Sequence, residues 1–207
     1  MKKLMIAMAA MGLSSVAMAG PSWTYVDLGY AQGSSAEEAG LESVDGYDLT
    51  GSFGFAGIWH INGTYGTISV DNGSSDVDID FYRIGAGVHP AITDSTDFVA
   101  EIGYTGWEVD VPNGPEPDAI DLTLGVRSMV TDQFELNGFL ATQIASSDGA
   151  LDGGNNDDAT LFSPSLGGQY FFTDNISVNV SYTWNDVQST LTSLNSDTAR
   201  FGVRWSF

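Results

Sequence analysis

The chain lacks cysteine entirely, and its 207 residues include only six lysines and arginines and two histidines. Without cysteine no disulfide framework can form, so packing and backbone hydrogen bonds alone must stabilise the fold. Beyond residues 1–19, no run of about 20 apolar residues is long enough for a transmembrane helix. The 27 acidic residues give a formal net charge of −21, which argues against nucleic acid as a partner because its phosphates would be repelled.

The N-terminus has the three parts of a secretory signal peptide. Lys2 and Lys3 precede an apolar run over residues 4–16, and small residues follow at positions 17–19. A membrane anchor is the alternative, but this run is shorter than the roughly 20 residues that span a bilayer. We therefore expect residues 1–19 to be cleaved and the protein to be exported.

Alternation of apolar and polar residues marks ten segments of about the length that a tilted membrane strand needs, roughly 9–11 residues. Short and long connections alternate between them, as in a membrane barrel with short periplasmic turns and long outer loops. The pattern predicts one all-β domain over 20–207, a transmembrane antiparallel up-and-down β-barrel. The ten expected strands are 23–31, 46–56, 58–69, 77–89, 97–109, 119–130, 134–144, 159–172, 176–185 and 197–207.

Pro164 fits this pattern badly, because a closed barrel has no free edge to accommodate a missing N–H. We expect a bulge there, or strand pairing that begins after Pro164. A barrel of eight strands with one hairpin outside remains an alternative.

Aromatic residues cluster at the two ends of the expected strands, as in the two interfacial girdles of a membrane barrel. Those near the expected long-loop ends are Tyr30, Tyr47, Tyr65, Tyr82, Tyr104, Trp107, Tyr182 and Trp184. Those near the short turns are Phe55, Trp59, Phe98, Phe134, Phe172 and Phe207.

The last nine residues alternate strictly and end on a C-terminal aromatic residue. This ending resembles the C-terminal signature of Gram-negative outer-membrane β-barrel proteins, and the whole mature chain resembles their porin-like barrel-domain family. The resemblance implies location in the cell outer membrane, contact with membrane lipid and lipopolysaccharide, and insertion by the barrel-assembly machinery. The residues that would carry the assembly signal are Phe201, Val203, Trp205 and Phe207.

All four arginines of the mature chain have inward parity on the expected strands, together with five acidic residues that include Asp48. Buried guanidinium groups require carboxylate partners. We expect Arg127 between Glu101 and Glu135, Arg83 beside Glu101, and both C-terminal arginines beside Asp27. The expected interior charge network is Asp27, Arg83, Glu101, Asp121, Arg127, Glu135, Arg200 and Arg204.

The sequence offers no catalytic, cofactor-binding or metal-binding motif. A barrel enzyme would need a base near the outer rim, whereas His60 and His89 fall beside short turns, where we expect them to line the lower mouth and bridge to Glu135 or Asp27. Asp78 and Asp80 at the rim have no histidine nearby in the pattern. The acidic loops favour diffuse contacts with divalent cations over one tight site.

Two functional hypotheses follow. The first is a non-enzymatic barrel with a structural or surface-interaction role, acidic extracellular loops and a charge-paired interior. The alternative is a narrow, cation-preferring, porin-like channel, because acidic loops concentrate cations at its mouth.

Overall fold

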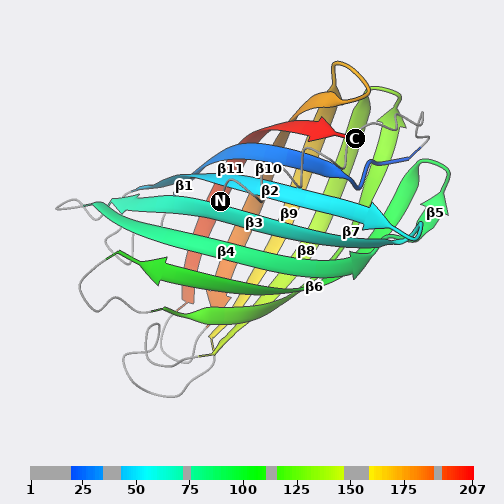
Figure 1. Cartoon of the computed structure of the whole chain (residues 1–207). Helices are drawn as coiled ribbons and strands as arrows, with labels where there is room; N and C mark the ends of the chain where they lie inside the picture. The colour runs from blue at the N-terminus through cyan, green and yellow to red at the C-terminus, as the bar shows by residue number, and fades with distance from the viewer. Residues whose placement is uncertain (1–19, 35–42, 72–75, 111–115, 147–158, 189–192) are drawn as a thin grey trace, which may run out of the picture.

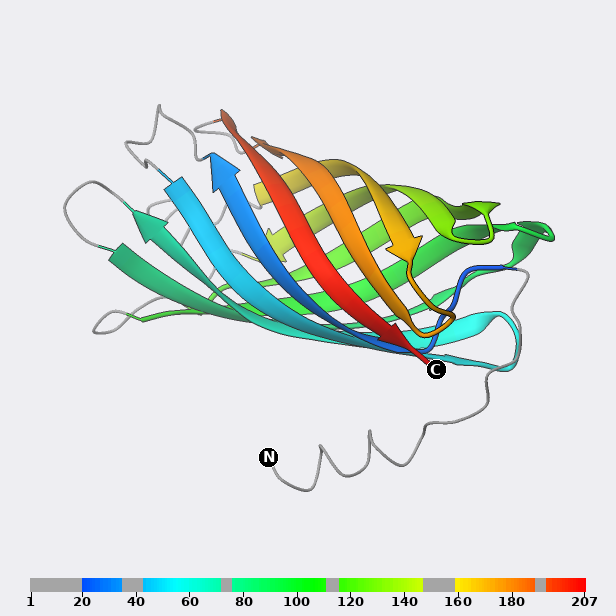
Figure 2. The ribbon, with the colours of Figure 1, turned by 90° about the horizontal axis from the view of Figure 1, so that it is seen from above.

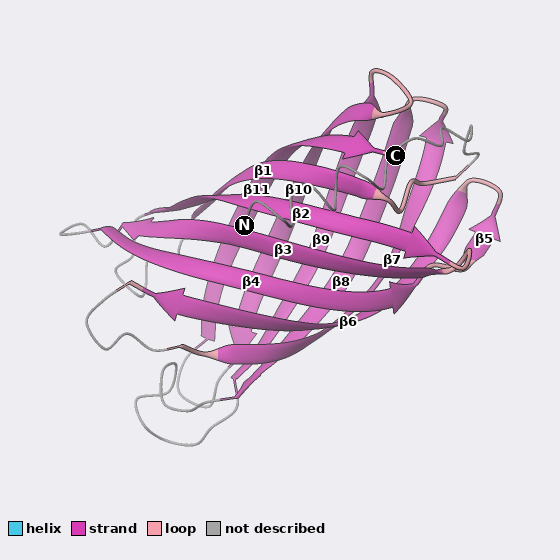
Figure 3. Ribbon diagram, in the orientation of Figure 1, coloured by secondary structure: helices cyan, strands magenta, loops and turns pink. Residues whose placement is uncertain are grey.

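The computed structural model describes residues 20–34, 43–71, 76–110, 116–146, 159–188 and 193–207 (Figure 1). Every regular element in these ranges is a strand (Figure 3). These ranges therefore contain no helix long and apolar enough to cross a membrane. The strands are β1 (Tyr25–Ser34), β2 (Ser43–Phe55), β3 (Trp59–Asp71), β4 (Asp76–Val88), β5 (Ala91–Thr93), β6 (Thr96–Val109), β7 (Asp118–Thr131), β8 (Phe134–Ser146), β9 (Ala159–Phe171), β10 (Ile176–Gln188) and β11 (Ser193–Ser206).

Ten long strands close into an antiparallel barrel. Each pairs with its neighbours in sequence, β1 pairs with β11, and β4 pairs with β6. This confirms the expected ten-stranded up-and-down barrel, and the eight-stranded alternative is wrong. The strand bounds agree with the sequence pattern to within about four residues at every end.

The sequence pattern missed the short strand β5. Its residues fall in the connection between β4 and β6, where Ala91 pairs with Asp97 and Thr93 pairs with Thr96. The register shifts between these two pairs, so the connection forms a small irregular flap at the short-turn end of the barrel. Three exposed residues carry too little periodicity for a sequence pattern to detect.

Pro164 lies inside β9, without the bulge or the late start of pairing that we expected. It pairs with Leu140 of β8. On the other side, the ladder with β10 passes from Ser165–Thr183 to Phe162–Asp186 in the same register and skips the proline. Ser163 Oγ donates to Asn185 Oδ1 at 2.8 Å within this gap. A side-chain hydrogen bond therefore links β9 and β10 where proline has no N–H to donate.

The outer wall is apolar and the lumen is polar. Ile84, Leu166 and Ile102, for example, are exposed by 66%, 61% and 60% on the outside of the barrel. Buried polar side chains gather inside instead, among them Asp27, His60, Asp121, Glu135 and Gln169. This reversal of a soluble protein's pattern is the arrangement that a lipid-facing barrel requires.

Candidate functional site in the barrel lumen

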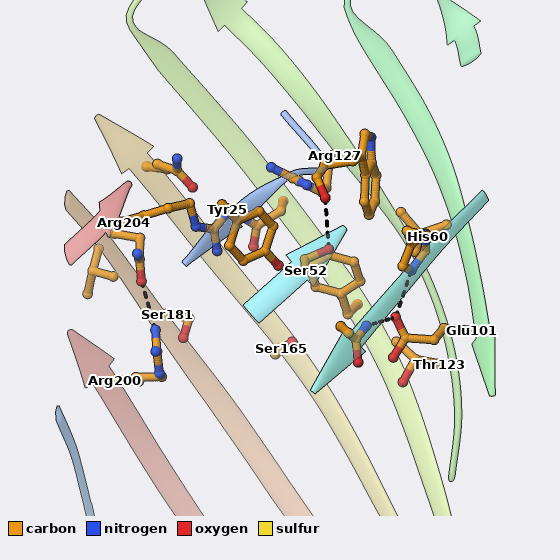
Figure 4. A pocket seen from close by; sticks show the side chains of 18 residues that line it. Tyr25, Ser52, His60, Glu101, Thr123, Arg127, Ser165, Ser181, Arg200 and Arg204 are labelled. Carbon is orange, nitrogen blue, oxygen red and sulfur yellow. Dashed lines mark hydrogen bonds and ion pairs between the residues drawn. The ribbon is translucent and has the colours of Figure 1, made fainter. Parts of the chain in front are cut away.

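A cavity of about 220 Å³ lies in the lumen toward the short-turn end (Figure 4). Side chains from nearly all strands line it, and three charged clusters form much of its wall. Polar groups such as Thr123, Ser165 and Ser181 fill the wall between those clusters. The lumen is therefore a small polar chamber, narrower than a wide solute channel.

Arg200 and Asp27 form the core of the first cluster. The Arg200 guanidinium contacts Asp27 Oδ1 at 2.5 Å and Asp48 Oδ1 at 2.6 Å. Arg204 Nε donates to Asp27 Oδ2 at 2.9 Å, and Asn179 donates to the same oxygen at 2.6 Å. Because Asp27 is only 1% exposed, these donors satisfy a carboxylate that burial would otherwise destabilise.

Inward-facing glycines make room for this cluster. A Cβ at Gly29 would overlap the Arg200 guanidinium. At Gly202, a Cβ would lie 2.7 Å from Asn179 Oδ1 and 2.8 Å from both Arg200 and Asp27. The two glycines are paired across the β1–β11 ladder, so no side chain occupies the part of the wall against which the Arg200 guanidinium lies.

The second cluster joins β3, β4, β6 and β7 around Arg83. Its guanidinium contacts both Glu101 and Asp121, and Nη1 donates to Asn62 at 2.8 Å. Asn62 in turn donates to Glu101 Oε2 at 2.5 Å. His60 Nε2 lies 2.8 Å from that same oxygen. Glu101 and Asp121 thus share one arginine, and Glu101 also contacts the Asn62 amide and the His60 imidazole.

Arg127 and Glu135 form the third and most buried pair. Arg127 Nε and Nη2 both donate to the Glu135 carboxylate at 2.8 Å, a two-pronged contact between β7 and β8. The residues are exposed by only 4% and 0%. Arg127 Nη1 also donates to the backbone oxygen of Ser22 at 3.0 Å, so the pair reaches the N-terminal segment.

Residues 20–24, here called the N-terminal segment, cross the short-turn end of the barrel before β1 begins (Figure 2). Pro21 and Trp23 are buried. Trp23 Nε1 donates to Asp97 at 2.7 Å, and the Trp23 carbonyl accepts from Ser52 Oγ at 2.9 Å. The Thr24 hydroxyl accepts from the Gly54 amide at 3.2 Å. The segment is therefore bonded to two separate strands of the barrel wall, β2 and β6.

Both histidines pack against Trp23. The indole lies 4.6 Å from the His60 ring and 4.2 Å from the His89 ring, centroid to centroid, and Arg127 Cζ lies 4.5 Å from it. His89 follows β4, and its Nδ1 lies 3.7 Å from Asp97 Oδ2. Burial lowers the pKa of His89, and nearby His60 lowers it further, whereas Asp97 acts in the opposite direction.

Several sequence expectations about these contacts were incomplete or wrong. Glu101 contacts Arg83 and His60 rather than Arg127, and the histidines do not bridge to Glu135 or Asp27. Arg83–Asp121 and Arg200–Asp48 were missed, because parity places residues on a face but leaves long side chains free to reach other strands. Trp23 was missed too, although its parity matches that of Tyr25 and Asp27.

The C-terminal strand presents its aromatic side to the outside. Phe201, Val203 and Trp205 are exposed by 55%, 51% and 59%. Phe207 stacks on Trp205 with ring centroids 5.6 Å apart, and its amide donates to the Thr24 carbonyl at 2.9 Å. The chain end is thus tied to the start of β1.

At the long-loop end, three tyrosines on the outer wall donate to acidic residues on neighbouring strands. The pairs are Tyr65–Asp80 at 3.1 Å, Tyr104–Asp118 at 2.9 Å and Tyr182–Asp197 at 2.8 Å. Asp78 accepts from Ser69 in the same zone. The described residues of this outer rim include no lysine or arginine. Seven further loop acids, at positions 37, 38, 42, 148, 152, 157 and 158, lie outside the described ranges.

Residues 5–207 match the family described as outer membrane protein beta-barrel domain. No curated protein matches the chain. Solved structures with a similar fold include the outer membrane protease OmpT of Escherichia coli, with a TM-score of 0.53, 12% identity and coverage of 95% of this chain and 99% of that one. An outer membrane channel from Pseudomonas putida F1 has a TM-score of 0.56, 10% identity and coverage of 95% and 100%. The NanC porin has a TM-score of 0.52, 13% identity and coverage of 87% and 100%.

Proposed function

Because this chain belongs to the outer membrane protein beta-barrel domain family, we propose that it is a closed, non-enzymatic barrel with a structural or surface-interaction role. Fold alone does not choose among the roles that such barrels perform, so the proposal rests on the lumen. The observation that carries it is the filled short-turn end, where Trp23 and the Arg127–Glu135 pair occupy the interior.

The placement of the histidines supports a role other than catalysis. A hydrolytic site at the outer rim would need a base within hydrogen-bond reach of the reacting groups. His60 and His89 instead lie buried at the opposite end of the barrel, against Trp23. The carboxylates beside them, Glu101 and Asp97, already accept hydrogen bonds from Asn62 and Trp23.

The outer rim supports a surface role. Short turns of such barrels face the periplasm and long loops face outward, so the Tyr–Asp pairs lie at the level of lipopolysaccharide headgroups. With acidic residues and no basic ones described there, we propose that the rim reaches lipopolysaccharide phosphates through divalent cations. We also retain the C-terminal strand as the signal read by the barrel-assembly machinery.

Single-channel recording tests the closed barrel. The mature protein is refolded, its folding is verified by heat-dependent gel mobility, and conductance is recorded near neutral pH under a potassium chloride gradient. We expect no conductance steps. Discrete steps with a reversal potential that favours cations would contradict the proposal and establish the narrow channel, which the polar cavity and acidic rim favour as the second candidate.

The cation bridge is tested separately with lipopolysaccharide micelles. Co-migration of the folded barrel with lipopolysaccharide should require magnesium or calcium and disappear with a chelator. The double variant Asp78→Asn, Asp80→Asn, which removes two carboxylates of the rim, should weaken this co-migration. Binding that is indifferent to chelation would contradict the proposed role of the rim.

A further inference from the structure

We propose that this barrel also has a second, conducting state that acid opens: protonation of His89 releases the N-terminal segment from the lumen and connects the cavity to the periplasmic end. This goes beyond the closed barrel proposed above, because it assigns an ion conductance to the chain at low pH. Four observations carry it: the stacking of Trp23, an imidazole nitrogen of His89 without a hydrogen-bond partner, the surrounding charges and the position of the cavity.

The two imidazoles share one face of the Trp23 indole. Their centroids lie 4.6 and 4.2 Å from the indole and only 5.5 Å from each other. Rings stacked on opposite faces of the indole would be much further apart. The stack therefore places His89, with His60 beside it, against the residue that closes the lumen, and the Arg127 guanidinium lies against the same indole.

Each imidazole has one buried nitrogen without a hydrogen-bond partner in the described part of the chain, Nδ1 of His60 and Nε2 of His89. His60 contacts the Glu101 carboxylate through its other nitrogen at 2.8 Å, whereas His89 Nδ1 lies 3.7 Å from Asp97. A neutral imidazole has one donor and one acceptor nitrogen, and both nitrogens are donors once it is protonated. Protonation of His89 therefore places an N–H on a nitrogen that has no acceptor, and a buried donor without an acceptor destabilises the state that contains it.

The charges around the stack add to this effect. The charged or titratable groups around it are Tyr25 of β1, Arg83 of β4, Asp97 and Glu101 of β6, Arg127 of β7 and Glu135 of β8. Each carboxylate already has a partner: Glu101 contacts Arg83 and His60, Glu135 accepts from Arg127, and Asp97 accepts from Trp23. A new imidazolium charge on His89 would have to compete for these acceptors.

His89 and Trp23 compete for the same atom. Asp97 Oδ2 accepts from Trp23 Nε1 at 2.7 Å and lies 3.7 Å from His89 Nδ1. A charged His89 attracts this carboxylate more strongly than a neutral one, so protonation weakens the hydrogen bond that fixes the indole. Burial lowers the pKa of His89, so the closed state disfavours the proton and acid shifts the population toward an open state.

The position of the cavity makes release of the segment consequential. Trp23, His60 and Arg127 line the cavity together with Glu101, Arg200 and Arg204 (Figure 4). Withdrawal of the indole removes one part of this wall at the short-turn end. The chamber between the clusters then becomes continuous with the periplasmic side, where water can hydrate the His89 imidazolium and burial no longer destabilises its charge.

The test is single-channel recording of three mature proteins at about pH 7.5 and about pH 5, on either side of the ordinary histidine pKa. The wild type should be silent near neutrality and show at least about tenfold more open events in acid, because release is linked to proton uptake. Trp23→Ala should conduct at both values. The variant His89→Gln should be silent at both, since glutamine does not titrate.

Heat-dependent gel mobility shows that each variant is folded before it is recorded. A wild type that stays silent in acid while Trp23→Ala conducts would overturn the proton switch. A silent Trp23→Ala, or a His89→Gln variant that still opens in acid, would overturn the assignment of the gate to Trp23 or of the switch to His89. Conductance of the wild type at neutral pH would instead contradict the closed barrel, so the two failures are distinguishable.

Discussion

The guanidinium carbon of Arg127 lies 4.5 Å from the centroid of the Trp23 ring, while the same guanidinium donates twice to Glu135 at 2.8 Å. This contact ties a segment that precedes the first strand to the β7–β8 wall. It joins the two features on which the closed lumen depends, a buried ion pair and an aromatic residue held within the barrel. The predictions below test that arrangement piece by piece.

The Arg127–Glu135 pair should be costly to break from one side. Glu135→Gln leaves a buried guanidinium without its countercharge, and we expect it to lower the free energy of unfolding by about 3–5 kcal/mol. Urea unfolding in lipid vesicles, followed by tryptophan fluorescence, measures this difference. The double variant Arg127→Met, Glu135→Leu should recover most of the loss. A single variant as stable as the wild type would show that the pair contributes little.

Two glycines offer a matched comparison. At Gly29 a Cβ would overlap Arg200, whereas at Gly51, opposite Val26 on the lipid-facing side, a Cβ would have nothing within 4 Å. Gly29→Ala should therefore destabilise the barrel by about 1–3 kcal/mol, since overpacking displaces the guanidinium. Gly51→Ala should change the free energy of unfolding by less than about 0.5 kcal/mol. Equal effects would mean that the interior cluster tolerates displacement of Arg200.

The outward face of β4 can be tested with a charge. Ile84 is 66% exposed and lies between the two aromatic girdles, so Ile84→Arg should cost about 2–4 kcal/mol in a bilayer. Thr67→Arg is the control, because Thr67 lies opposite Asp80 near the outer rim, where arginine costs roughly 0–1 kcal/mol. The measurement is unfolding free energy in vesicles. A reversed order would place the membrane boundary elsewhere.

Acid should destabilise the closed barrel through His89. Its pKa in the folded protein is lowered, so the unfolded chain binds the proton more readily as pH falls below about 6.5. Stability is therefore fully present above that value and decreases in more acidic solution. The urea concentration at the unfolding midpoint should be lower at about pH 5.5 than at about pH 7.5. His89→Gln should show a smaller fall, and an identical fall would assign the effect to other groups.

The sequence predicted the barrel because membrane strands impose a strict rule, alternation between lipid and lumen, that leaves a periodic trace. The same rule placed Arg83, Arg127, Arg200 and Arg204 inside. The acidic partners of these arginines were harder to predict, because a guanidinium on a long side chain reaches beyond the adjacent strand, as Arg200 does to Asp48. The Trp23 stack was missed although Trp23 has the inward parity of Tyr25 and Asp27, because parity does not show that its ring stacks on two histidines from other parts of the chain.

The closure of the lumen by the N-terminal segment is tested most directly by the accessibility of a thiol inside it. The chain has no cysteine, so Thr123→Cys, on the cavity wall, provides a single reporter. In lipid nanodiscs near neutral pH, a cationic, membrane-impermeant thiol reagent should modify it slowly in an otherwise wild-type barrel. Modification should be at least about tenfold faster when Trp23→Ala is added. A control cysteine in place of exposed Thr93 should react at the same rate with and without Trp23→Ala. Equal rates for Thr123→Cys with and without Trp23 would contradict closure by this segment.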